Sequence, residues 1–158
     1  LAREADLELL VSLRLAWLAD VMHMPLTETL AHHVTRDLRQ AVAEQRVALL
    51  EENGTPLAMG QCMMSARTVS QLGGFYVPEE LRGRSYGLAM IDRLCRLERQ
   101  RGILRSLILT IRRSIGLTQS LNRLGFKSAG YMGLILFDPP IDASRNMAEA
   151  ETTPLVQE

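Results

Sequence analysis

The sequence RGRSYG places two arginines and several small residues directly in front of a stretch with helical apolar spacing. Gly83, Ser85 and Gly87 leave the backbone accessible, and the N–H groups of such a turn, together with the dipole of the helix that follows, bind phosphate groups. Arg82 and Arg84 can add charge-assisted hydrogen bonds to the same groups. This loop therefore predicts a pyrophosphate site, although plain turn geometry also places glycines near a helix start.

The loop lies in the basic part of the chain. Residues 81–127 carry ten arginines and one lysine against Asp92 and Glu98, whereas the whole sequence of 158 residues has a net charge of zero. A neutral chain argues against a general nucleic-acid surface. Two interpretations stay open for the arginines: a solvated helix face, or a site for a polyanionic small molecule. The glycine spacing does not match the dinucleotide-binding pattern.

Hydrophobic periodicity and turn residues predict the elements that must position this loop. Four helices are expected, each with apolar residues three to four apart, at residues 4–21, 27–44, 86–101 and 116–124. Thr27 is a suitable N-cap for the second helix. Gly102 and Gly125 should end the last two helices.

Strands are predicted between these helices. Residues 46–66 form a hairpin that turns at Asn53-Gly54, the dipeptide best suited to a tight turn, and residues 68–77 form the next strand. Two adjacent glycines, Gly73 and Gly74, predict a bulge or a close approach by another backbone or a ligand. A buried strand is predicted at residues 104–111, and a last strand at 130–137.

Length and composition predict one globular domain. The chain has 47% hydrophobic residues, and its polar, proline-containing end at 139–158 reads as a tail after a domain at 1–138. No apolar run reaches the length of a membrane span, and charges occupy the first residues, so we expect a cytoplasmic protein that does not act at a membrane. Cys62 and Cys95 lack ligand spacing, which predicts buried thiols and no metal site.

The sequence resembles the GCN5-related N-acetyltransferase (GNAT) family over residues 2–137. The stretch QLGGFYVPEELRGRSYGLAMI is similar to the family's phosphate-binding motif, with Arg82, Ser85 and Gly87 at motif positions. The stretch READLELLVSLR resembles the entry into the family's first helix, and SLILTIRRSIGLTQSLNRLGFKSAGY resembles its C-terminal half.

The resemblance implies an α/β (α+β) fold. Its mixed, mostly antiparallel sheet has helices on both faces and is splayed between the fourth strand, here 69–77, and the fifth, here 105–111, with acetyl-coenzyme A in the splay. The family's first strand is expected to be missing or shortened here. The cofactor-binding residues that the resemblance implies are Phe75, Tyr76, Val77, Arg82, Gly83, Arg84, Ser85, Tyr86, Gly87 and Ser114.

The implied reaction is transfer of an acetyl group to a primary amine of a small molecule or of a protein or peptide by direct attack. The backbone of Phe75 and Val77 would polarise the thioester carbonyl. Glu79 is a candidate base, while Tyr86 and Tyr131 are candidate general acids. A homodimer is compatible with the resemblance.

Three positions depart from the family pattern. Ser85 replaces a glycine, Ser114 replaces an asparagine that holds pantetheine, and Leu121 replaces the tyrosine associated with protonation of the leaving thiolate. The missing tyrosine keeps an alternative open, a non-catalytic sensor or interaction module that binds acyl-coenzyme A. A third alternative is an unrelated α/β domain whose turn mimics the loop.

Overall fold

The computed structural model describes residues 1–110 and 115–133. Their elements follow the order η1 (Glu4–Asp6), α1 (Leu7–Asp20), α2 (Glu28–Ala43), β1 (Val47–Glu52), β2 (Thr55–Ala66), β3 (Val69–Tyr76), η2 (Glu79–Leu81), α3 (Tyr86–Gln100), β4 (Arg105–Ile108) and α4 (Ile115–Arg123). Residues Leu1–Lys127 form one compact unit, and Gly130–Gly133, which belong to a second unit, have no regular structure.

The helix boundaries follow the local signals in the sequence. Thr27 caps α2 by accepting a 3.1 Å hydrogen bond from the N–H of Leu30. Gly102, in the left-handed region at φ 88°, follows α3, and Gly125 has the same φ after α4. The predicted first helix begins instead with the 3₁₀ turn η1 before α1.

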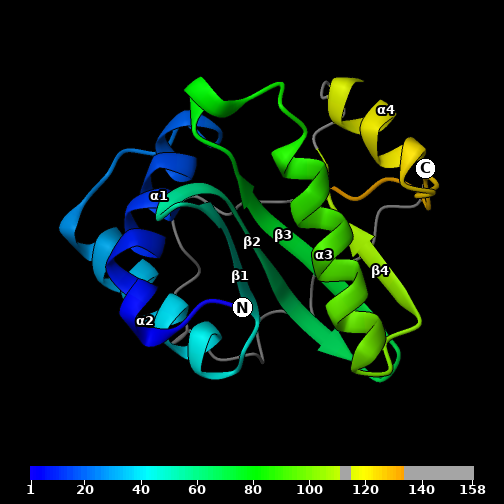
Figure 1. Cartoon of the computed structure of the whole chain (residues 1–158), viewed down its shortest axis with the longest axis horizontal. Coiled ribbons are helices and arrows are strands. Elements are labelled where there is room, and N and C mark those ends of the chain that lie inside the picture. The colour runs from blue at the N-terminus through cyan, green and yellow to red at the C-terminus, as the bar shows by residue number, and fades with distance from the viewer. Residues whose placement is uncertain (111–114, 134–158) are drawn as a thin grey trace, which may run out of the picture. The chain divides into compact units, whose positions relative to one another are not determined.

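The four strands form one mixed sheet in the order β1-β2-β3-β4, in which only the β3–β4 pair is parallel (Figure 1). The β1–β2 turn places Asn53 (φ 51°) and Gly54 (φ 78°) in the left-handed region, which confirms the predicted hairpin. Within the described residues no strand precedes β1, although the N–H of Ala2 donates to Val47 O at 3.0 Å.

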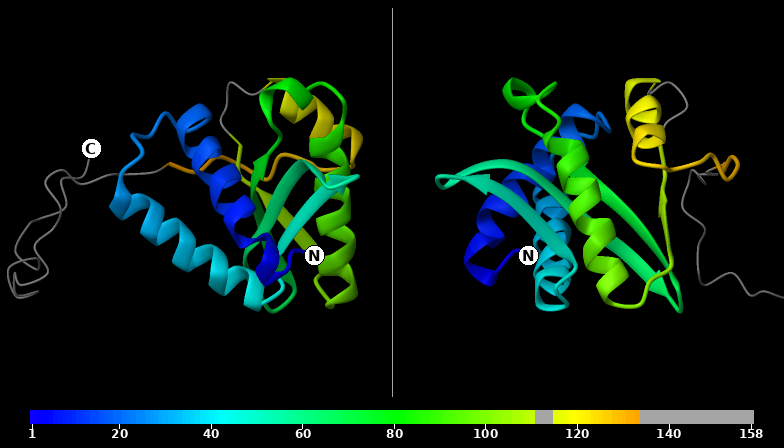
Figure 2. Two further views of the ribbon diagram at one scale, coloured as in Figure 1. Left: turned by 60° about the vertical axis from the view of Figure 1, so that its left-hand side comes forward. Right: turned by 45° about the vertical axis from the view of Figure 1, so that its right-hand side comes forward.

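Helices cover both faces of the sheet (Figures 1 and 2). On one face α1 and α2 pack over side chains such as Val47, Met59 and Tyr76. On the other face α3 packs over Ala48, Ala58, Cys62 and Leu72 through Met90 and Leu94. Alternation along the strands explains why neighbouring residues enter different cores.

Two irregularities interrupt the β2–β3 ladder. Between the pairs Met59–Tyr76 and Gln61–Gly73, β3 has two residues, Gly74 and Phe75, opposite Gly60 alone. This bulge confirms the irregularity predicted from the glycine pair. The second irregularity adds one residue to β2 between Cys62 and Met64.

Two predicted strands are shorter than expected. The strand predicted to reach residue 111 ends at Ile108, because its ladder with β3 ends there, and residues 109 and 110 are irregular. The strand predicted at 130–137 has no regular structure at 130–133, and the rest of it lies outside the described residues.

Candidate functional site

The loop between β3 and α3 forms a turn with accessible backbone. After Pro78 and η2, the backbone is left-handed at Gly83 (φ 80°) and Ser85 (φ 65°), and α3 begins at Tyr86. The side chain of Ser85 makes no capping hydrogen bond to the helix. The N–H groups of the first turn of α3 therefore remain available to a ligand, as the sequence predicts.

Space around the loop glycines is open. Among the described residues, a Cβ atom at Gly83 would meet no other atom within 4 Å, and one at Gly87 would meet only Val77 Cγ2 at 3.6 Å, an ordinary contact. Packing within the chain thus does not require glycine at position 87. Close approach of a ligand to the backbone would explain a glycine there.

Arg82 is turned toward the sheet. Its Nε donates a 3.1 Å hydrogen bond to Val77 O, and its Nη2 lies 3.7 Å from Asp20 Oδ2. The guanidinium also lies over the Tyr76 ring, 5.8 Å from its centroid. Arg84 is exposed and makes no ion pair or hydrogen bond in the described part of the chain. The structure therefore assigns Arg82 a contact within the protein and leaves Arg84 open to solvent.

The end of β3 lacks a strand partner on one side. Pairing with β4 stops at Leu72 and Ile108, while β3 continues to Tyr76. The backbone of Gly73–Tyr76 faces the β4 side of the sheet without a ladder in the described residues. Phe75 and Val77, the predicted carbonyl polarisers, lie at this end, where Val77 O already accepts from Arg82.

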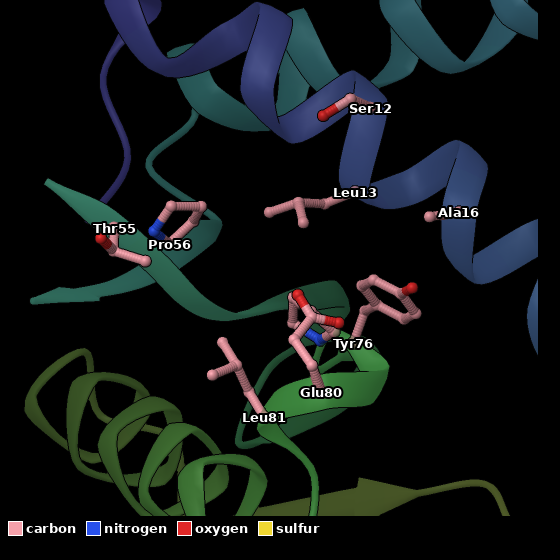
Figure 3. Close-up of a pocket in the computed structure, with 9 residues that line it drawn as sticks. Ser12, Leu13, Ala16, Thr55, Pro56, Tyr76, Glu80 and Leu81 are labelled. Atoms are coloured by element: carbon pink, nitrogen blue, oxygen red, sulfur yellow. The ribbon is translucent and has the colours of Figure 1, made fainter.

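A cleft of about 690 Å³ opens on the α1 face at the same end of β3 (Figure 3). Leu13, Glu80 and Leu81 point into it (Figure 3). Its lining consists of Ser12, Leu13, Ala16, Thr55, Pro56, Tyr76, Pro78, Glu80 and Leu81. Glu79, the base predicted from the sequence, does not line this cleft, whereas its neighbour Glu80 does.

Arg14 is a second charged group at this end of the sheet, and the sequence analysis did not predict it. It is buried at 7% exposure, and its Nη2 donates a 2.9 Å hydrogen bond to Gln61 Oε1. Burial lowers the pKa of its guanidinium to about 10, so the group stays positively charged at neutral pH. An arginine in a predicted helix is normally interpreted as exposed to solvent, and only the folded structure shows that Arg14 is buried.

The residues predicted as general acids or as pantetheine contacts lie in different parts of the chain. Tyr86 is the first residue of α3 and packs against the core on the α3 face. Leu121 is buried on α4 at 7% exposure. Tyr131 belongs to the second unit, and Ser114 lies outside the described residues.

Arg96 on α3 and Arg101, directly after this helix, form ion pairs with carboxylates of the protein. Arg96 Nε lies 2.8 Å from Asp92 Oδ2, and Arg101 Nη1 lies 2.9 Å from Glu98 Oε1. Among the described residues no group of three or more His, Cys, Asp or Glu side chains could hold a metal ion. No helix within these residues has the length and apolar character needed to cross a membrane.

Comparison with known proteins gives a family and a set of related folds. A model of the acetyltransferase (GNAT) family matches residues 14–126. No protein with a curated description matches the chain.

Several solved structures have a similar fold at low sequence identity. A predicted acetyltransferase with acetyl-CoA from Clostridium acetobutylicum is 20% identical, with a TM-score of 0.68 and 94% of each chain covered. Ribosomal-protein-alanine N-acetyltransferase from Brucella melitensis is 18% identical, with a TM-score of 0.69 over 82% of this chain and 83% of that one. A Mycobacterium tuberculosis protein in complex with CoA and NLQ is 19% identical, with a TM-score of 0.63 over 85% and 74%.

Proposed function

The chain belongs to the acetyltransferase (GNAT) family, and on that premise we propose that it transfers the acetyl group of acetyl-coenzyme A to a primary amine by direct attack. The amine belongs to a small molecule or to a protein or peptide. One observation carries the proposal of a donor site: the left-handed turn at Gly83 and Ser85 leads into a helix whose first N–H groups have no side-chain cap.

The donor would lie along the end of β3. The N–H of Arg82 already donates to Glu79 O at 3.1 Å, so the pyrophosphate binds the N–H groups at Gly83–Gly87. Arg84, which has no partner in the described chain, adds a charge-assisted hydrogen bond. The donor's pantetheine amides pair with the backbone of Phe75–Val77, because β3 continues there beyond its ladder with β4. Similar folds crystallised with acetyl-CoA or CoA support acetyl-coenzyme A as the donor.

Catalysis then depends on positioning and on backbone hydrogen bonds. The amine nitrogen forms a bond to the acetyl carbon while the carbon–sulfur bond breaks, and an N–H group of β3 stabilises the negative charge on the carbonyl oxygen. Glu80 accepts the proton of the attacking amine directly or through water, a role supported by its position in the lining of the cleft. With Leu121 at the usual tyrosine position, the thiolate takes its proton from solvent.

Calorimetry with acetyl-coenzyme A tests the donor site. Gly87→Glu places bulk and negative charge at the second residue of α3 and should abolish binding. Thr29→Glu, at the exposed second residue of α2, is the matched control and should bind as the wild type does. Unchanged affinity of Gly87→Glu would refute the placement. Thiol release with a panel of amines tests transfer, and binding without release on any amine would favour the non-catalytic module.

A further inference from the structure

Arg14 places a buried cation directly against the bulge of β3. The left-handed Gly74 (φ 59°) lies so close that a Cβ atom on it would overlap with Nη1, Nη2 and Cζ of Arg14. The guanidinium also lies over the ring of Trp17, with Cζ 5.2 Å from the ring centroid. Contacts from α1, β2 and β3 thus fix the orientation of the group.

The charge of Arg14 has no counter-charge among the residues that the structure describes. Its hydrogen-bond partner is the neutral amide of Gln61, and no carboxylate of the described residues lies within ion-pair distance. Asp20, on the same helix, pairs with Tyr76 and Arg82 instead. Burial of an unpaired charge destabilises a folded protein, and buried charges are normally paired.

Two nitrogens of this guanidinium have unused hydrogen-bonding capacity. Nε and Nη1 donate no hydrogen bond within the described residues. Both keep some contact with solvent, since the described residues contain no fully buried side-chain nitrogen without a partner. A small anion bound beside Gly74 would satisfy both the charge of the guanidinium and its free donors.

We propose that Arg14 binds a carboxylate of the acetyl acceptor, so that the substrate is a small amine carrying a carboxylate, as an amino acid does. This inference rests on the proposed function, because the amine must attack at the end of β3. A guanidinium and a carboxylate match each other with two parallel hydrogen bonds. The donor's phosphates do not serve as the anion, because three strand residues, or about 10 Å, separate Gly74 from Val77, where the phosphate loop starts.

Thiol release, measured with pairs of acceptors that differ in their carboxylate, tests whether the enzyme prefers the acceptor that carries this group. The probes are the protein amino acids and their C-terminal amides, which keep the amine and lose the negative charge. The wild type should show a kcat/KM about ten- to a hundredfold higher for at least one amino acid than for its amide, as expected for a charge-assisted bond. Equal values for every pair, or no transfer to either class by protein that binds acetyl-coenzyme A, would overturn the inference. Failure to bind acetyl-coenzyme A would instead overturn the proposed function.

The variant Arg14→Met tests whether Arg14 is responsible for the preference for an acceptor with a carboxylate. Methionine keeps the length of the side chain and removes the charge, and Arg39→Met, at an exposed arginine of α2, is the control. Arg14→Met should lower kcat/KM for the acid to that for the amide, leave the amide's value unchanged, and keep the affinity for acetyl-coenzyme A. An equal loss for acid and amide would show that Arg14 acts on the reacting thioester, which would refute the inference.

A measurement on the wild type removes any dependence on the folding of that variant. Trp17 is the only tryptophan of the chain, so its fluorescence reports on the neighbourhood of Arg14. Titration of coenzyme A-saturated protein with N-acetyl amino acids should give a saturable change, whereas their amides should give none. The same response to both series, or to neither, would contradict the proposal.

Discussion

The hydroxyl of Tyr76 donates a 2.8 Å hydrogen bond to Oδ2 of Asp20 and so joins the end of β3 to the last residue of α1. Arg82 approaches the same carboxylate oxygen from the phosphate loop. Three elements that surround the candidate site thus meet at one carboxylate, which couples the position of α1 to the position of the loop.

Loss of the Tyr76 hydroxyl should destabilise the fold modestly. Tyr76→Phe removes one hydrogen bond, so the free energy of unfolding in urea should fall by about 0.5 to 1.5 kcal/mol. Asp20→Asn should act on the same contact, and the double variant should cost less than the sum of the two single ones. Strict additivity in this cycle would mean that the two groups do not interact in solution.

Substitution of Arg84 should affect only the affinity for acetyl-coenzyme A, whereas substitution of Arg82 should also affect stability. Arg84→Ala should weaken acetyl-coenzyme A binding by about 1.5 to 3 kcal/mol in calorimetry and leave the stability unchanged, because Arg84 is exposed and makes no hydrogen bond or ion pair in the described chain. Arg82→Ala should lower the free energy of unfolding as well, since Arg82 holds Val77 O. Arg99→Ala, on the exposed face of α3, is the control. An equal loss of affinity in the control would place the border of the site elsewhere.

Ser85→Gly should stabilise the protein. Ser85 adopts φ 65° and makes no capping hydrogen bond, so its left-handed backbone is strained. Glycine removes this strain but makes the unfolded chain more flexible, and the net gain in the free energy of unfolding should be about 1 kcal/mol. Ser85→Ala keeps that strain and should change the free energy of unfolding by less than about 0.5 kcal/mol. A loss of stability in Ser85→Gly, measured in urea, would show that the hydroxyl has a partner in solution.

Cys62 should resist alkylation in the native protein. Burial, followed by the charge of Glu98, raises the pKa of its thiol from 9.0 to about 11. At pH 8 the thiolate fraction is then about a hundredfold lower than in the unfolded chain, and modification mapped by mass spectrometry should require urea. Because the folded pKa is the higher one, the thiol's contribution to stability is present below pH 9 and is lost as the pH rises toward 11. Fast native modification at pH 8 would contradict this assignment.

Turnover should not depend strongly on a tyrosine. Tyr86→Phe should change kcat by less than about tenfold, because Tyr86 packs against the core and solvent can protonate the thiolate. A fall of a hundredfold or more with intact cofactor affinity would identify Tyr86 as the acid. Leu121→Tyr should not raise activity, because Leu121 is buried and a larger side chain there costs about 1 to 3 kcal/mol of stability.

Local chemistry made much of the fold predictable. The turn at Asn53-Gly54, the cap at Thr27 and the bulge at Gly74 each depend on residues adjacent in the sequence. The turn at Gly83 and Ser85 was predictable for the same reason, because its small residues directly precede α3.

Contacts across the fold were not predictable from the sequence. Arg14 acquires its role from Gln61, 47 residues away, and from the close approach of Gly74. Arg82 turns inward because Asp20 ends a helix far from it in the sequence. The choice between Glu79 and Glu80 depends on which of two adjacent side chains faces α1, a matter of geometry that composition does not encode.

The bulge in β3 bears on how this strand could change its length during evolution. A chain without Gly74 could still pair Gln61 with Gly73 and Met59 with Tyr76, since the residue between these pairs on β2 would then face a single partner. The sheet does not need the extra residue, which interrupts the regular ladder of hydrogen bonds between β2 and β3. A deletion there should therefore be acceptable to the sheet, so the extra residue serves the close approach of Arg14 to the strand and not the pairing of β2 with β3.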